Sequence, residues 1–470
     1  MLKNRIRDEI QSYLNFTPTL GQIDAIENLA NFTVNPKPNS CVLLKGFAGT
    51  GKTSIIAGFV KTLQKLSIKF ELLAPTGRAA KVLTEYSGVQ AQTIHKCIYR
   101  QKSMSEGLGR FVLNFNKLTD AIFIVDEASM LSNTSFDDNT FGSGKLLSDL
   151  VEFVSQGKNC RLIIVGDTAQ LPPVGLDISP ALNYSELSNF NLDVTEIFLN
   201  EVVRQQSESG ILYNATQIRN ILDSGFIETP KLSVKGFDDI KRISGGELIE
   251  FLSEEYEKDG REGNVVICYS NKRANKYNNG IRSRVLYIED ELSPGDYLMV
   301  ARNSYYWVDD IPELGFIANG DIVEVMRVGK RYDMYGFRFA DVTIRLLDDN
   351  KQLIDVRIIL DSLMMDGPSL GSEHMKTLYQ QISLDYMHIK TSKARLKKIK
   401  EDPFFNAMQV KFAYAVTCHK AQGGQWPNIF IDQGFFKPEM INREYLRWLY
   451  TAVTRATSKV YLVNFDESFF

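Results

Sequence analysis

The chain contains few cysteines, and they lie far apart. Its 470 residues include five, at positions 41, 97, 160, 268 and 418, with no Cys-x-x-Cys pair. This spacing argues against a disulfide framework and against a zinc site, and it favours a reducing compartment. We therefore expect a cytoplasmic protein without structural disulfides or zinc.

Long hydrophobic runs and an excess of one charge are also missing. No stretch approaches ~18 consecutive apolar residues, and residues 1–8 lack the apolar core of a signal peptide. We therefore expect no contact with a membrane. The 54 basic and 57 acidic residues give a net charge of −3, so a polyanion has to bind at local basic patches. A chain of this length is expected to form about three domains.

Short apolar segments alternate with helical patterns in two blocks of the chain. The candidate strands are residues 41–44, 70–74, 121–125 and 161–165 in the first block, and 265–269, 412–417, 428–432 and 460–463 in the second. Such alternation predicts parallel sheets connected by crossover helices. The two blocks therefore predict two α/β domains.

Between residues 292 and 409 the pattern changes to short strands joined by turns. The candidate strands here are residues 300–308, 322–328, 335–339, 342–347 and 354–359. Asn319-Gly320 is a strong turn signal. We predict a small β-barrel inserted into the second α/β domain. The basic segment 390–400 that follows is either a solvated helix face or a nucleic-acid contact.

Residues 46–53, Gly-Phe-Ala-Gly-Thr-Gly-Lys-Thr, fill every fixed position of the phosphate-binding loop G-x-x-x-x-G-K-[ST]. An apolar segment precedes the loop and a helical pattern follows it. Its glycines permit backbone angles that direct successive N–H groups at a polyphosphate. We therefore predict that a nucleoside triphosphate binds with Mg²⁺, with Lys52 on the outer phosphates and the Thr53 hydroxyl on the metal. The predicted contacts of the loop are Gly46, Ala48, Gly49, Thr50, Gly51, Lys52 and Thr53.

Two carboxylates, Asp126 and Glu127, directly follow the apolar segment 122–125. Ligands bind where the strands of an open α/β sheet end. Asp126 is suited to hold Mg²⁺ through its water shell, and Glu127 is suited to position or deprotonate an attacking water.

Three further residues are predicted to contact the γ-phosphate. Gln170 follows the apolar segment 161–165 and is placed to report the presence of that phosphate. Arg204 and Arg455 are candidates for stabilising the charge that develops there, with a surface salt bridge as the alternative for each.

The order of these motifs resembles a superfamily 1 helicase of the RecD/Dda-like branch, superfamily 1B. Residues 17–22 resemble the segment of that family that reads adenine, 74–80 resemble motif Ia, 92–95 motif Ib, 126–130 motif II, 166–170 motif III, and the segment around Arg204 motif IV. Residues 417–423 resemble motif V and 453–455 motif VI. The resemblance covers about residues 17–463. It implies an ATP-dependent DNA helicase that moves 5′→3′ on single-stranded DNA, with ATP and Mg²⁺ between two domains.

The resemblance also implies roles for further residues. Gln22 is the expected adenine contact, and Gln425 stands where related enzymes often carry a glutamate near the ribose. Val203 replaces a tyrosine that stacks on adenine in some members, so base selectivity is expected to be loose. The expected contacts to single-stranded DNA are Pro75, Thr76, Arg78, Thr93 and His95 on the first domain, and Asn271, Thr417, His419 and Lys420 on the second.

The expected fold is α/β, with two RecA-like parallel-sheet domains, a β-hairpin (pin) inserted in the first and an SH3-like β-barrel inserted in the second. The expected boundaries are 1–96 and 118–222 for the first domain, 97–117 for the pin, 223–291 and 410–470 for the second domain, and 292–409 for the barrel. The expected partners are single-stranded DNA and single/double-strand junctions, and the protein is expected to work as a monomer. Two alternatives stay open: an RNA helicase of the same superfamily, and a DNA-stimulated ATPase that displaces proteins without unwinding.

Overall fold

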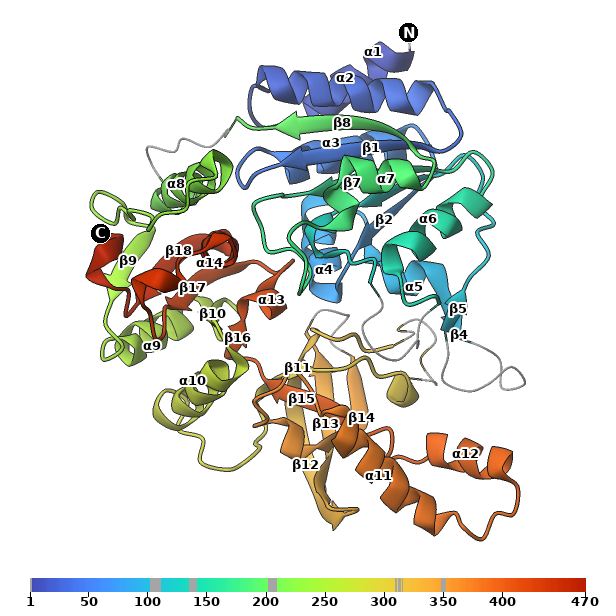
Figure 1. The fold of residues 1–470 in the computed structure, drawn as a ribbon, viewed down its shortest axis with the longest axis vertical. Coiled ribbons are helices and arrows are strands. Elements are labelled where there is room, and N and C mark those ends of the chain that lie inside the picture. The colour runs from blue at the N-terminus through green and yellow to red at the C-terminus, as the bar shows by residue number, and fades with distance from the viewer. Residues whose placement is uncertain are drawn as a thin grey trace.

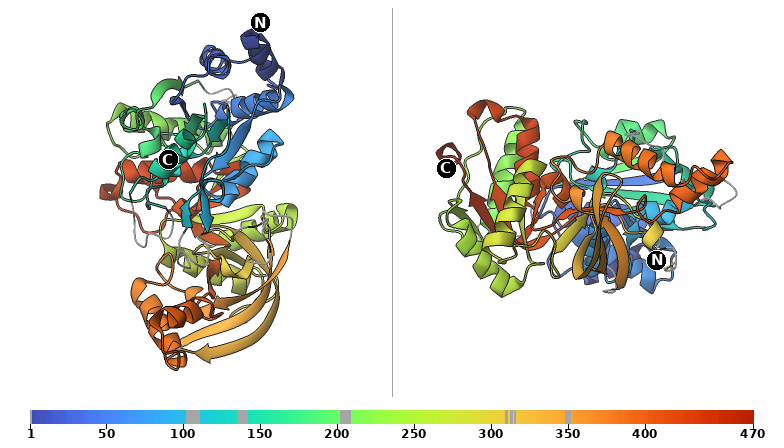
Figure 2. Two further views of the ribbon diagram at one scale, coloured as in Figure 1. Left: turned by 90° about the vertical axis from the view of Figure 1, so that its right-hand side faces the viewer. Right: turned by 90° about the horizontal axis from the view of Figure 1, so that it is seen from below.

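Two parallel sheets and one closed barrel form the main β-structure of this chain (Figure 1). The computed structural model describes residues 2–101, 111–134, 142–201, 209–308, 311, 314, 316–347 and 352–470. The predicted fold class, α/β with two parallel sheets and an inserted barrel, is confirmed. The barrel lies at one end of the molecule, beyond both sheets (Figure 2).

The first sheet has the strand order β3-β2-β6-β7-β1-β8, and all its pairs are parallel. Its strands are β1 (Ser40–Gly46), β2 (Phe70–Ala74), β3 (Gln92–Thr93), β6 (Ile122–Val125), β7 (Arg161–Gly166) and β8 (Asp193–Leu199). Strands β6 and β7 are buried along their whole length. Apart from Arg161 at the start of β7, they read as apolar runs because helices cover both faces of a parallel sheet.

Alternate side chains of β1 face two different helical layers. Val42 and Leu44 pack in one core cluster with residues of α1 (Leu2–Ser12), α2 (Leu20–Val34), α3 (Lys52–Lys65) and α4 (Gly77–Ser87). Cys41 and Leu43 pack in another with residues of α5 (Ile94–Ile98), α6 (Leu146–Gln156) and α7 (Tyr184–Asn189). Successive strand residues point to opposite faces, so β1 lies between the two layers.

The second sheet has the order β16-β10-β17-β18-β9, again with all pairs parallel. Its strands are β9 (Ile240–Ile243), β10 (Asn264–Cys268), β16 (Ala415–Thr417), β17 (Trp426–Asp432) and β18 (Ala456–Val463). Helices α8 (Gly210–Ser224) and α14 (Arg443–Val453) pack on one face, and α9 (Leu248–Asp259) and α10 (Asn271–Arg284) on the other. Most of helix α8 lies before residue 222, where the first domain was predicted to end. The helix nevertheless packs against α14 of the second domain.

The barrel closes through β11 (Tyr297–Val300), β12 (Ile322–Met334), β13 (Phe337–Leu346), β14 (Leu353–Ile359) and β15 (Met408–Phe412). Two strand predictions in this region are wrong in extent. Residues 300–308 do not form a strand, because β11 ends at Val300 and a 3₁₀ turn occupies Tyr306–Val308. The segments 335–339 and 342–347 belong mostly to the single strand β13. Helices α11 (Ser372–Asp385) and α12 (Ser392–Lys400) lie between β14 and β15 in the chain, and residues of both belong to a core cluster that includes Phe339.

The segment 412–417, predicted as one strand, is divided between two sheets. Phe412 ends β15 and pairs with Leu298 in the barrel, whereas Ala415 begins β16 and pairs with Val266 in the second sheet. Both halves are apolar and buried, so the hydrophobic pattern carries no sign of the change of sheet.

The predicted hairpin is present at its base. Strand β4 (Tyr99–Gln101) pairs antiparallel with β5 (Phe111–Leu113), and residues 102–110 between them lie outside the described part. The Phe111 ring lies 4.3 Å, between centroids, from the ring of Tyr305 in the barrel insertion. In the described ranges, no helix combines the length and the apolar character needed to cross a bilayer.

Candidate functional site

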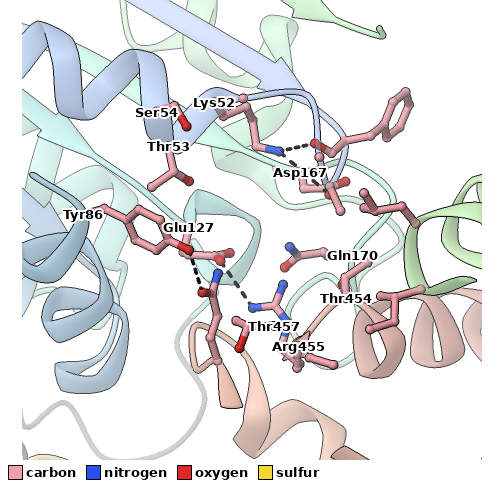
Figure 3. A pocket seen from close by; sticks show the side chains of 18 of the residues that line it. Lys52, Thr53, Ser54, Tyr86, Glu127, Asp167, Gln170, Thr454, Arg455 and Thr457 are labelled. Carbon is pink, nitrogen blue, oxygen red and sulfur yellow. Dashed lines mark hydrogen bonds and ion pairs between the residues drawn. The ribbon is translucent and has the colours of Figure 1, made fainter. Parts of the chain in front are cut away.

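A cavity of about 370 Å³ lies between the two sheets and collects most of the predicted nucleotide contacts. Its lining includes the loop after β1, the residues after β6 and β7, and residues 425 and 454–457 of the second domain (Figure 3). The first sheet supplies groups from the carboxyl ends of its strands, where open α/β sheets bind ligands. The topology thus brings together segments that are more than 400 residues apart.

The phosphate-binding loop has the backbone that its glycines predict. Gly49 and Gly51 adopt φ angles of 78° and 83°, a region in which a side chain is strained. The Lys52 ammonium donates hydrogen bonds to the carbonyl oxygens of Gly46 (2.8 Å) and Phe47 (2.7 Å). It also lies 4.0 Å from the Asp167 carboxylate, so the lysine is held at the mouth of the loop.

Gln22 lies behind this loop and does not line the cavity. It is fully buried, and its Nε2 donates to the carbonyl of Thr50 at 2.9 Å. Its Oε1 accepts from the Thr19 N–H at 3.0 Å as part of a capping box at the start of α2. The amide nitrogen therefore supports the loop and the amide oxygen caps α2, and contact with adenine requires at least one of them to be released.

The two carboxylates after β6 have different surroundings. Asp126 is buried, and its Oδ1 accepts a 2.8 Å hydrogen bond from the Glu127 N–H. Burial, with a smaller effect of the neighbouring Glu127, raises the pKa of Asp126 to about 6. Glu127 has a φ of 53°, and its Oε1 lies 3.3 Å from the Arg455 guanidinium. This left-handed backbone turns Glu127 toward the second domain.

Arg455 enters the cavity from the second domain and is 3% exposed. Besides Glu127, its guanidinium donates to the carbonyls of Thr451 (3.3 Å) and Gly424 (3.4 Å). Arg204, the other predicted arginine, lies outside the described residues. Gln425 lines the same cavity, and its Oε1 accepts from the Tyr86 hydroxyl at 3.2 Å across the domain boundary (Figure 3).

Gln170 is buried on the first-domain side, where its Oε1 accepts from the Ser129 hydroxyl at 3.4 Å. The structure adds two residues that the sequence analysis missed, Asp167 and Tyr450. The Asp167 carboxylate accepts from the Ala169 N–H (2.9 Å) and from the Tyr450 hydroxyl (2.8 Å), and burial raises its pKa. The position of Asp167 directly after β7 could have indicated it as a site residue from the sequence. Tyr450 lies inside helix α14 among buried residues, and no sequence pattern indicated its contact with the site.

The threonines predicted to contact DNA share one structural position. Each is the N-cap of a helix at the end of a strand: Thr76 lies two residues after β2, and Thr93 and Thr417 are the last residues of β3 and β16. The hydroxyls of Thr76 and Thr93 accept from N–H groups of the first helical turn, each at 3.2 Å. Strands β3 and β16 are edge strands of the two sheets and β2 is the neighbour of β3, so the three threonines lie at or next to sheet edges, and none of them lines the nucleotide cavity.

Three basic side chains of the predicted DNA set have restricted surroundings. The Arg78 guanidinium lies over the Trp426 ring, 4.0 Å from its centroid, and thereby joins the two domains. Burial lowers the pKa of His95 to about 4, so its ring is neutral at pH 7. Lys420 donates a hydrogen bond to Asn319 of the barrel insertion, and burial lowers its pKa.

The remaining members of the set lie near these groups. Asn271 begins α10 and lines a small hollow with Thr417 and Lys420. His419 is half-buried in α13 (Cys418–Ala421), and burial lowers its pKa. Pro75 is half-buried between β2 and Thr76.

Comparisons with known proteins agree with these motifs. An AAA-domain family model matches residues 19–221, and a UvrD-like helicase C-terminal domain model matches residues 412–463. The ATP-dependent DNA helicase dda of phage T4 is 24% identical over 90% of this chain and 94% of its own length. The ATP-dependent RecD2 DNA helicase of Deinococcus radiodurans is 27% identical over 56% of this chain.

This chain spans about a third of the length of some relatives. It covers 34% of RecD2 and 38% of an uncharacterized protein of Methanocaldococcus jannaschii that is 25% identical over 94% of this chain. Among solved structures, a Pif1 helicase from Bacteroides in complex with ADP-AlF3 and single-stranded DNA is 16% identical, with a TM-score of 0.47, over 97% of this chain and 95% of its own. Together with the ordered motifs, the two family matches and the relatives dda and RecD2 make this chain similar to the superfamily 1B helicases of the RecD/Dda-like branch.

Proposed function

We propose that this protein is an ATP-dependent DNA helicase that moves 5′→3′ along single-stranded DNA and separates duplex strands at its hairpin. One observation carries the proposal. Lys52, Glu127 and Gln170 of the first domain meet Arg455 of the second in a single cavity. A cleft that uses groups from two domains changes shape when ATP is bound or hydrolysed, and such closure is a general route from hydrolysis to motion.

The chain's own groups suggest how hydrolysis proceeds. In this proposal the loop N–H groups and Lys52 hold the phosphates, and Glu127 accepts the proton of the attacking water. Arg455 lies beside Glu127, so it is placed to stabilise charge that develops on the γ-phosphate. Arg204 and Gln425 remain proposed contacts, to the γ-phosphate and the ribose respectively.

A magnesium ion fits the groups beside the loop. Thr53 and Asp126 offer one hydroxyl and one carboxylate at the same cavity. Mg²⁺ commonly takes one or two protein oxygens, substrate phosphates and several waters, so two protein ligands suffice. No cluster of three or more His, Cys, Asp or Glu side chains suited to a metal occurs among the described residues. When bound with ATP, the ion neutralises phosphate charge.

Motion along DNA requires that closure change the spacing of two strand-binding sites. Thr76 and Thr93 border one sheet and Thr417 the other. Hydroxyl, amide and cationic groups at phosphates bind without reading sequence. We propose that these groups, with Pro75, Arg78, His95, Asn271, His419 and Lys420, grip the strand, and that the protein acts as a cytoplasmic monomer with the domain boundaries given above.

Duplexes with a single-stranded tail on one side test this proposal. Unwinding is measured with 5′-tailed, 3′-tailed and blunt DNA of one sequence and with the matching RNA duplex, with ATP and Mg²⁺ present. ATP hydrolysis is measured in the same reactions. We expect unwinding from the 5′ tail only. Unwinding from the 3′ tail alone contradicts the direction, and unwinding only of the matching RNA duplex identifies an RNA helicase. ATP hydrolysis that is stimulated by DNA without unwinding identifies a protein-displacing ATPase.

A further inference from the structure

Tyr450 connects the ATP loop to the segment that carries Arg455. It lies in α14 of the second domain and is 1% exposed. Its hydroxyl accepts a hydrogen bond from the Ala48 N–H of the loop and donates one to the Asp167 carboxylate, each at 2.8 Å. Ala48 and Asp167 belong to the first domain, so one buried hydroxyl joins the two domains at the nucleotide cavity.

Adjacent residues extend this connection to the segment after β7. The Thr451 hydroxyl accepts from the Leu171 N–H at 2.9 Å, and the Gln422 amide donates to the Leu171 carbonyl at 2.7 Å. Side chains of the second domain therefore hold both ends of the segment from Asp167 to Leu171. This segment contains Gln170, which lines the cavity.

The link from Tyr450 to Arg455 is short and buried. Arg455 lies two residues beyond the end of α14 at Val453, and its Nε donates to the carbonyl of Thr451 at 3.3 Å. Ala452 and Val453 between them are fully buried. Because close-packed segments of this kind move as a unit, a shift of Tyr450 against the loop also shifts the Arg455 guanidinium against the cavity.

We infer that Tyr450 is a positioning residue whose hydroxyl sets the place of Arg455 relative to the ATP loop during hydrolysis. The inference rests on the proposed function, since it assumes that Arg455 acts on the γ-phosphate. The groups proposed to hold the phosphates belong to the first domain, so they do not move with Arg455 when the hydroxyl is lost. We therefore expect kcat to fall and KM for ATP to stay within about twofold of the wild-type value. A misplacement of ~1 Å costs up to ~100-fold in rate, and we expect Tyr450→Phe to lower kcat at least ~10-fold.

A double-mutant cycle tests this role. ATP turnover with single-stranded DNA is measured for wild type, Tyr450→Phe, Arg455→Ala and the double variant. If Tyr450 acts through Arg455, the two losses are not additive, and Tyr450→Phe causes no further loss in the Arg455→Ala background. Additive losses, or a wild-type kcat for Tyr450→Phe, overturn the inference. If wild type itself shows no DNA-stimulated turnover, the proposed function fails instead.

Tyr445→Phe is the matched control. Tyr445 lies on the same helix and is buried, but its hydroxyl accepts from Gln433 at 3.3 Å, within the second domain. We expect Tyr445→Phe to keep the wild-type kcat. If Tyr450→Phe does not fold, Thr451→Val replaces it, with Thr451→Ser restoring the acceptor for the Leu171 N–H. We then expect Thr451→Val to lower kcat, and this loss not to add to that of Arg455→Ala. We expect Thr451→Ser to restore kcat, and a serine variant that does not recover overturns the inference.

Discussion

Replacing Glu127 by glutamine removes a charge from the cavity and keeps the size of the side chain. In the structure Glu127 faces Arg455 at 3.3 Å, and the side chains are 22% and 4% exposed. Glutamine retains an oxygen that accepts from this guanidinium. The contact then loses only the difference between a charged and a neutral hydrogen bond, about 1 kcal/mol. We therefore expect a folded variant that still binds ATP.

The expected loss of turnover is much larger than this change in contact energy. Removing a general base typically costs about 10²–10⁴ in rate, which corresponds to roughly 2.7–5.4 kcal/mol in the barrier. Steady-state hydrolysis with single-stranded DNA measures this loss, and a fluorescent ATP analogue measures binding. Glu27→Gln is the control, because Glu27 pairs with Lys3 and Arg7 on the surface of α1 and α2. Wild-type turnover by Glu127→Gln would refute the assignment of Glu127 as the base.

Three further changes have defined outcomes. Lys52→Ala abolishes ATP turnover and leaves the circular dichroism spectrum unchanged, because the ammonium bonds to carbonyls of its own loop; substantial turnover contradicts the loop assignment. Burial raises the pKa of Asp126 to about 6, so the folded, metal-free protein holds this proton more tightly than the unfolded chain and loses stability, roughly 2 kcal/mol, as pH rises from 4 to 7. Urea unfolding of Asp126→Asn should lack this part of the slope, and an unchanged slope refutes the prediction. Lys420→Ala lowers affinity for single-stranded DNA and reduces the salt slope by ~0.7 in fluorescence anisotropy, whereas an unchanged slope shows that Lys420 meets no phosphate.

Strands were predictable where burial on two faces leaves an unbroken apolar run. The segments 70–74 and 161–165 correspond to β2 and to all of β7 except Gly166. The two-residue strand β3 was missed because it is too short to show a pattern. Strand β8 was missed because its residues 193–196 are exposed or half-buried at the edge of the sheet. The exposed residues of β8 leave no unbroken apolar run, which is the signal of a strand that is covered on both faces.

Short stretches of the sequence are enough to define the local chemistry of the nucleotide site. The glycines of residues 46–51 dictate the loop backbone, since only glycine adopts angles such as the φ of 83° at Gly51 without strain. The carboxylates of Asp126 and Glu127 follow directly from their position after an apolar strand. These features depend on neighbours in the chain, so the order of residues is enough to reveal them.

Which distant groups meet became visible in the folded structure alone. It showed that the amide of Gln22 supports the loop from behind, that Arg78 stacks on Trp426 across the domain boundary, and that Tyr450 bonds to Ala48 and Asp167. Tyr450 is about 400 and 283 residues away from these partners, inside a helix whose pattern indicates only burial. A long-range hydrogen bond leaves no periodic trace in a sequence, because it depends on how two separately folded sheets are packed together.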